Sequence, residues 1–134
     1  MPKTFRATDT VLHLAGPGPI SLWDNDGSSW DPTDRLELNS GQVLSVFTYS
    51  KTWDYQECHP DGEEVALVLT GDVDLLLDDG DGEVAIRVES GSGSVVPTGT
   101  WHRIAPRESS TVLFITPAPA RTEHRHAGRP EMSE

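Results

Sequence analysis

Two histidines, His59 and His102, occur in short frames of defined residue types and spacing. The frames run Glu57-Cys58-His59, four residues, Glu64, six residues, Gly71, and Gly91, five residues, Pro97-Thr98-Gly99, two residues, His102. Imidazole nitrogens and carboxylate oxygens are ligands of divalent first-row metals. On short strands, alternation can point such side chains at a common interior. A buried metal centre is therefore the primary hypothesis.

The strand pattern predicts which side chains form this centre. If residues 51–59 form one strand, the alternate residues on one face are Lys51, Trp53, Tyr55, Glu57 and His59. His59 and Glu64 flank the turn 60–63, so a tight hairpin would place their side chains close together. The predicted ligands are His59, Glu64 and His102, with Glu57 as a candidate fourth ligand.

Each of these residues has an alternative role. The two histidines could be hydrogen-bonded core residues without metal, and the partner of a buried Glu64 could be an arginine instead of a metal. Glu57 could coordinate, accept a proton from a ligand imidazole, or act as an acid or base. Tyr55 is the second candidate for moving protons during catalysis. Tyr55 and Trp53 either belong to the core or line a pocket for a small organic molecule.

Three other residues are assigned to structure or surface. Cys58 faces away from Glu57 and His59 on a regular strand, so we expect a core or interface residue and not a thiolate ligand. His124 and His126 lie in a polar segment, and we expect both at the surface.

Composition limits the partners. The chain has 134 residues, a formal charge of -12, one cysteine and no segment that approaches the roughly 20 apolar residues of a spanning helix. The acidic field repels phosphate backbones and anionic lipids, so neither nucleic acid nor a membrane is expected as a partner. The lone cysteine cannot form an intrachain disulfide, and the first residues lack the apolar run of a signal peptide. We expect a cytoplasmic protein.

The pattern of short apolar runs and turn residues indicates an all-β sandwich or barrel. The expected strands are 11–15, 35–39, 42–49, 52–58, 64–70, 72–78, 83–89, 93–96, 101–105 and 110–117. In 72–78 and 83–89, apolar residues alternate with polar ones, which predicts one buried and one wet face. The runs 65–69 and 112–115 are apolar on both faces, which indicates sheet packing or a subunit interface. A homodimer is expected.

One domain is expected over residues 1–134, with a core at about 35–117. Residues 16–34, within the N-terminal segment 1–34, contain two Gly-Pro steps and an acidic turn. We expect a long loop that wraps the barrel and acts either as a lid or as a surface insertion. The tail 118–134 has no apolar pattern, so we expect it to be poorly ordered or to lie along a sheet edge.

The two frames resemble the two motifs of the cupin superfamily. The resemblance covers residues 41–117 and agrees in spacing at Glu64, Gly71, Gly91, Pro97, Gly99 and His102. It implies an antiparallel jelly-roll barrel with a metal in its interior, held by the motif histidines and glutamate. The sequence departs from the pattern at Glu57, where the family has a histidine, and at Pro106, where it has an asparagine.

The ligand types suit one divalent ion per chain, Fe, Mn, Ni or Zn. Cupins include dioxygenases, isomerases, epimerases and decarboxylases, so the resemblance implies a small-molecule metalloenzyme, with a dioxygenase as the leading expectation. The alternatives are a metal-dependent sensor or ligand-binding protein without turnover and a structural cupin with an empty barrel. The fold alone does not choose among them.

Overall fold

The protein is built almost entirely from antiparallel strands. The computed structural model describes residues 2–25, 40–118 and 122–127. One short 3₁₀ turn, Ala7–Asp9, precedes eleven strands: β1 (Thr10–Leu14), β2 (Ile20–Asp24), β3 (Gln42–Tyr49), β4 (Tyr55–Cys58), β5 (Glu64–Thr70), β6 (Asp72–Asp78), β7 (Glu83–Glu89), β8 (Gly93–Val96), β9 (Trp101–Pro106), β10 (Ser110–Pro117) and β11 (Glu123–His126). In the described part of the chain, no helix has the length and apolar character needed to cross a membrane.

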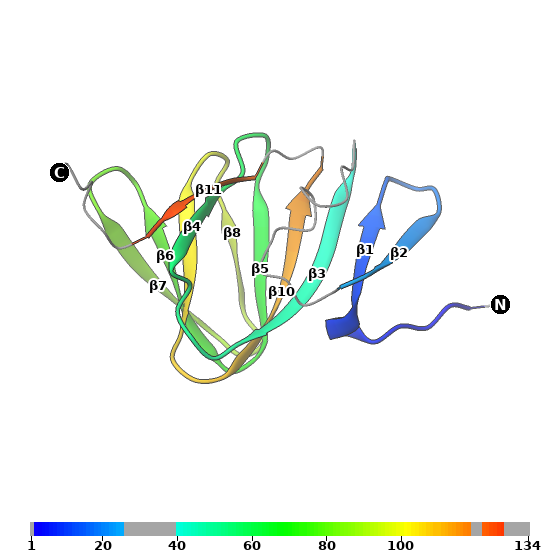
Figure 1. The fold of residues 1–134 in the computed structure, drawn as a ribbon, viewed down its shortest axis with the longest axis horizontal. Coiled ribbons are helices and arrows are strands. Elements are labelled where there is room, and N and C mark those ends of the chain that lie inside the picture. The colour runs from blue at the N-terminus through cyan, green and yellow to red at the C-terminus, as the bar shows by residue number, and fades with distance from the viewer. Residues whose placement is uncertain (1, 26–39, 119–121, 128–134) are drawn as a thin grey trace.

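The strands form two sheets that enclose one main core. Sheet A has the order β2-β1-β3-β10-β5-β8, and sheet B has the order β11-β4-β9-β6-β7. In Figure 1, sheet B lies to the left, and the β1–β2 hairpin extends sheet A to the right. The predicted antiparallel double-sheet, jelly-roll architecture is confirmed.

Alternation along the strands explains the core. On β10, Val112 and Phe114 are buried while their neighbours along the strand are only partly buried. They pack with the inward side chains of the facing sheet, including Val73, Leu75 and Ile104. Each fully buried side chain of this size contributes about 1.5–3 kcal/mol to folding.

The β6–β7 hairpin follows this pattern in one strand only. Val73 and Leu75 of β6 are buried, as expected. On β7, however, Val84 and Ile86 are 53% and 38% exposed, and only Val88 is buried. The prediction of a buried face along 83–89 is therefore wrong. The reason is that β7 is the edge strand of sheet B, with only β6 beside it.

The N-terminal segment also differs from the prediction. Residues 20–24, expected within a long loop, form β2 and pair with β1 from Ile20 to Asp24. The strand expected at 35–39, and the part of the expected lid at 26–34, lie outside the described residues.

The expected tail contains a strand. β11 pairs with β4 at the edge of sheet B, in a register that joins Glu123 to Cys58, His124 to Glu57 and His126 to Tyr55. The tail was expected to be poorly ordered or to lie along a sheet edge. Residues 122–127 lie along a sheet edge.

A motif glycine ties the two sheets together. Gly71 connects β5 of sheet A to β6 of sheet B with a φ of +99°. A Cβ atom here would collide with Ser110, whose hydroxyl accepts a hydrogen bond of 3.0 Å from the amide of Asp72. Only glycine combines this backbone conformation with so close an approach.

Candidate metal centre

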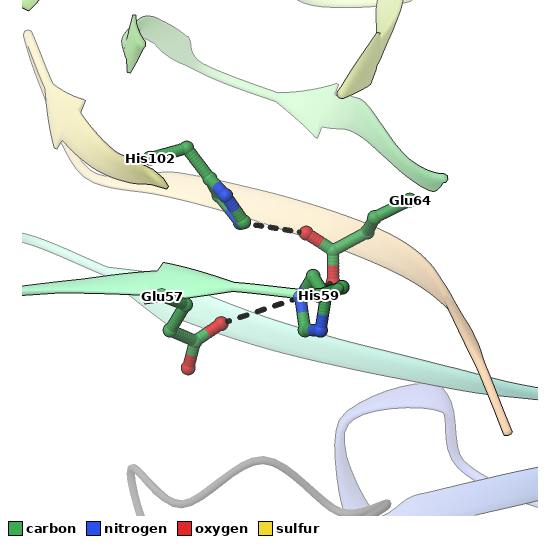
Figure 2. Close-up of side chains that lie close together, drawn as sticks. All are labelled: Glu57, His59, Glu64 and His102. Carbon is green, nitrogen blue, oxygen red and sulfur yellow. Dashed lines mark hydrogen bonds and ion pairs between the residues drawn. The ribbon is translucent and has the colours of Figure 1, made fainter. Parts of the chain in front are cut away.

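Four predicted side chains meet in the interior. Glu57 is on β4, His59 follows that strand, Glu64 begins β5, and His102 is on β9. All four are buried, and each offers one ligand atom within 4.8 Å of the others. Figure 2 shows them turned toward one another from these separate strands. The structure thus brings together the predicted ligand set.

A strand pairing and a turn place the histidines. β4 and β9 are neighbours in sheet B, where Glu57 pairs with His102. The Pro97-Thr98-Gly99 turn lies beside His59, because the amide of Gly99 donates to the carbonyl of His59 at 3.0 Å. Gly99 has a φ of +72°, which favours glycine. The two motifs are therefore in direct backbone contact.

Glu64 lies between the two imidazoles. Its Oε1 is 3.0 Å from Nε2 of His102, and its Oε2 is 3.1 Å from Nε2 of His59. The hydroxyl of Thr116, on β10, donates to Oε2 at 2.8 Å. A buried carboxylate needs such partners, because an isolated one costs several kcal/mol or more.

The far nitrogens of both rings are also engaged. Nδ1 of His102 lies 3.0 Å from the carbonyl oxygen of Thr100, and Nδ1 of His59 lies 3.2 Å from Oγ1 of Thr122. Since a carbonyl only accepts, Nδ1 of His102 carries a proton. These contacts direct the Nε2 atom of each ring toward Glu64, which is how ligand histidines are commonly oriented.

Glu64 and His102 form a charged pair. Burial alone would raise the pKa of the Glu64 carboxyl, but hydrogen bonds from His102 and His59 outweigh it and hold that pKa well below its usual range. Burial alone would lower the pKa of His102, but the hydrogen bond and charge of Glu64 outweigh it and raise that pKa. His102 also faces acceptors at both nitrogens, which favours the imidazolium form. Positive charge is therefore favoured at this position.

Glu57 lies at the side of this group. Its Oε1 is 3.9 Å from Nε2 of His59, and its Oε2 is 3.3 Å from Nε2 of His124. The prediction that His124 is a surface residue is thus wrong: its side chain is only 23% exposed and lies beside a candidate ligand. His126 is exposed, as expected.

The donor set fits a divalent cation. Ligand atoms about 2.1 Å from one ion lie at most about 4.2 Å apart, so a group within 4.8 Å needs only small side-chain movements. The buried carboxylates of Glu57 and Glu64 are also stabilised by positive charge nearby. The imidazoles present Nε2, the atom that a metal would take, with their other nitrogens already engaged.

Aromatic rings border the centre on one side. Trp53 is buried and stacks on Tyr55, with ring centroids 5.1 Å apart and an interplanar angle of 8°. The Trp53 ring also lies 6.5 Å from that of His102, and Tyr55 lies 5.8 Å from that of His124. The strand predicted at 52–58 is shorter, since β4 covers only Tyr55–Cys58. Trp53 precedes β4 but still reaches the interior.

Two further residues of the predicted strand lie away from the centre. Lys51 is exposed. Cys58 is buried opposite Glu123 of β11, outside the ligand group, and burial raises the pKa of its thiol.

Three residues near the ligands were missed from the sequence. Thr116 was predictable in part, since it alternates with the inward Val112 and Phe114 of the same strand. Thr122 and His124 carried no such signal, because their position depends on the pairing of β11 with β4.

The comparisons with known proteins show a fold. No protein-family model and no curated protein sequence matches the chain. Among solved structures, it is similar to salicylate 1,2-dioxygenase from Pseudaminobacter salicylatoxidans, with a TM-score of 0.53, 14% identity, and coverage of 62% of this chain and 25% of that one.

Two other solved structures are similar over a comparable length. A cupin-2 domain protein from Shewanella frigidimarina has a TM-score of 0.49, 22% identity, and coverage of 57% of this chain and 70% of that one. Hydroxypropylphosphonic acid epoxidase from S. wedmorenis has a TM-score of 0.49, 16% identity, and coverage of 56% and 42%. The chain has the cupin fold, as the two motifs predicted.

Proposed function

We propose that the protein binds one divalent metal ion per chain through His59, Glu64 and His102, with Glu57 as the fourth ligand. The observation that carries the proposal is the group of four buried side chains whose ligand atoms lie within 4.8 Å of one another. The nitrogen and oxygen donors suit Fe, Mn, Ni or Zn.

Elemental analysis of the purified protein tests this proposal. The wild type is expected to hold about one ion per chain, and the double variant His59→Ala, His102→Ala is expected to lose it. The matched control is His13→Ala, His126→Ala, which removes two histidines that lie outside the ligand group. Full metal content in the first double variant would refute the proposal.

We further propose that the protein is an enzyme that oxidises a small organic molecule with dioxygen. A bound Fe ion would supply the redox chemistry, while Tyr55 would move protons. Acid–base action by Glu57 is the alternative to its role as a ligand. The aromatic rings of Trp53 and Tyr55 would hold the apolar part of the substrate. The fold shared with a salicylate dioxygenase is in keeping with this proposal.

The indole N–H of Trp53 supports a ligand with an oxygen acceptor. It is buried and has no hydrogen-bond partner among the described residues. A donor left in this state costs about 1–3 kcal/mol, which a bound acceptor would recover.

An oxygen electrode tests the reaction with the Fe(II)-loaded protein and catechols, thiols and diketones. Substrate-dependent oxygen uptake that disappears in the His59→Ala, His102→Ala variant is expected. Metal binding without uptake across these classes would instead favour the alternative of a metal-dependent ligand-binding protein.

The expected homodimer would use the outer face of sheet A. Leu69 and Val95 are exposed there, at 39% and 53%, beside the half-buried Leu67 and Leu113 on neighbouring strands. Light scattering should give twice the chain mass for the wild type and a smaller mass for Val95→Asp. The cytoplasmic location expected from the sequence also stays a proposal.

A further inference from the structure

The strand β11 brings polar side chains to the candidate metal centre. It lies next to β4, and His124 pairs with Glu57 in the register. Alternation places Thr122 and His124 on the side of the ligands, while Arg125 lies on the opposite side. The polar sequence around His124 thus has an inner and an outer face.

Thr122 contacts the proposed ligand His59. Its Oγ1 lies 3.2 Å from Nδ1 of His59, and both side chains are buried. On the other side of the ring, Nε2 of His59 lies 3.1 Å from Glu64. The hydroxyl therefore fixes the rotation of an imidazole whose opposite nitrogen faces the ligand group.

His124 contacts the fourth ligand. Its Nε2 lies 3.3 Å from Oε2 of Glu57, while Oε1 of the same carboxylate faces His59 at 3.9 Å. The two oxygens of Glu57 are thus divided between β11 and the ligand group. With the His124 imidazole beside one oxygen, the other oxygen is left to face a cation in the ligand group.

Arg125 holds the strand from outside. Its Nε donates to Oε1 of Gln56 at 2.6 Å, its Nη2 donates to Asp78 at 3.0 Å, and its guanidinium lies 4.2 Å from the Trp101 ring centroid. Gln56 in turn donates to Glu83 at 2.9 Å. The outer contacts therefore fix β11 against three other strands of sheet B.

We propose that β11 completes the metal centre, with Thr122 and His124 as positioning residues for His59 and Glu57. This inference rests on the proposed function, since it needs a bound ion. Neither residue has to coordinate. Groups that orient metal ligands typically change metal affinity by about 10–100-fold when they are removed.

Competition between the protein and a chelator for Co(II) tests the inference. Thr122→Val and His124→Ala should each weaken Co(II) binding by about tenfold or more and shift the visible absorption of the bound ion. Thr122→Ser should restore both properties, because it keeps the hydroxyl. His126→Ala, on the same strand but exposed, is the matched control and should bind like the wild type.

A double-mutant cycle separates positioning from folding. If His124 acts through Glu57, adding His124→Ala to Glu57→Gln should weaken binding by much less than it does in the wild type. Equal losses in both backgrounds would overturn this role. Urea unfolding of the metal-free variants identifies any that no longer fold. Thr122→Ser still tests the hydroxyl in that case: if its Co(II) affinity is no higher than that of Thr122→Val, the role of the hydroxyl is overturned.

The outcomes also separate this inference from the proposed function. If the wild type binds Co(II) no better than His59→Ala, His102→Ala, the metal centre itself is refuted. If the wild type binds well and the folded Thr122→Val and His124→Ala variants stay within about twofold of it, well short of the usual loss, only the role of β11 is overturned.

Discussion

His102 and Glu64 form a buried pair in which Nε2 of the imidazole lies 3.0 Å from Oε1 of the carboxylate. Their pKa values move in opposite directions, since that of Glu64 is lowered and that of His102 is raised. Without metal, a proton on His102 balances the buried carboxylate. A cation at this position would take over the role of that proton.

The metal-free protein should be most stable in mildly acidic solution. The lowered pKa of Glu64 gives a contribution that is present above its unfolded pKa of about 4.3 and is lost as pH falls through the folded value. The raised pKa of His102 gives a contribution that is complete below about pH 6.5 and is lost as pH rises through its folded value. Urea midpoints in EDTA should therefore be higher at pH 5.5 than at pH 8.5. A midpoint that increased over this interval would contradict the charged pair, and His102→Gln should remove the alkaline loss.

Metal affinity should show the opposite dependence. Binding must displace the proton of His102, so the apparent affinity should rise by up to about tenfold per pH unit until the raised pKa is passed. Chelator competition with Co(II) between pH 6 and 8.5 measures this slope. An affinity that does not change with pH would mean that His102 releases no proton.

Thr116 should stabilise the fold through Glu64. Thr116→Val keeps the shape but removes the hydroxyl that donates to Oε2 at 2.8 Å, so the free energy of unfolding should fall by about 1.5–3 kcal/mol. The control is Thr111→Val on the same strand, whose hydroxyl contacts Thr48 at the surface. Similar losses in the two variants, measured by urea denaturation, would speak against a special role for the buried hydrogen bond.

Gly71 should tolerate substitution less well than Gly91. Both have positive φ angles, +99° and +85°, so alanine is strained at either position. Only at Gly71 would the new Cβ meet Ser110, whereas nothing lies within 4 Å at Gly91. Gly71→Ala should therefore cost about 1–3 kcal/mol more than Gly91→Ala in urea unfolding. Equal costs would show that the backbone absorbs the collision.

Arg125 should influence metal binding from outside the barrel. Arg125→Ala removes the contacts to Gln56, Asp78 and Trp101, and a loosened β11 should weaken Co(II) binding several-fold. Arg87→Ala is the control, because Arg87 pairs with Asp72 on the far hairpin. Equal Co(II) affinities for the two variants would indicate that β11 keeps its place without the contacts of Arg125.

The ligand group was predictable because its information is local. Fixed offsets across the turns determine where His59, Glu64 and His102 lie in each motif, and alternation indicates which way they face. The hairpin expected to join His59 and Glu64 is wrong, because β4 and β5 lie in different sheets. The same reasoning identified the strands of the core, where apolar residues recur at every second position. That the two motifs meet depends on the pairing of β4 with β9, which the resemblance to cupins implied and the spacings alone do not.

The features that were predicted wrongly depend on how distant strands are arranged. His124 is polar and lies in a polar segment, so only the register between β11 and β4 reveals its position beside Glu57. Val84 and Ile86 alternate like core residues, yet their exposure follows from the place of β7 at a sheet edge. Sequence periodicity indicates that a strand has an apolar face but not whether another layer covers it.

The position of Trp53 gives the protein an internal optical probe. Its ring lies in the core, 6.5 Å from that of His102, whereas Trp23 is 42% exposed at the far edge of sheet A. The fluorescence emission of an indole in an apolar environment is shifted to shorter wavelength, and a paramagnetic ion nearby would quench it. Titrations could therefore be followed by fluorescence on the unlabelled chain, with Trp53→Phe identifying the responding ring.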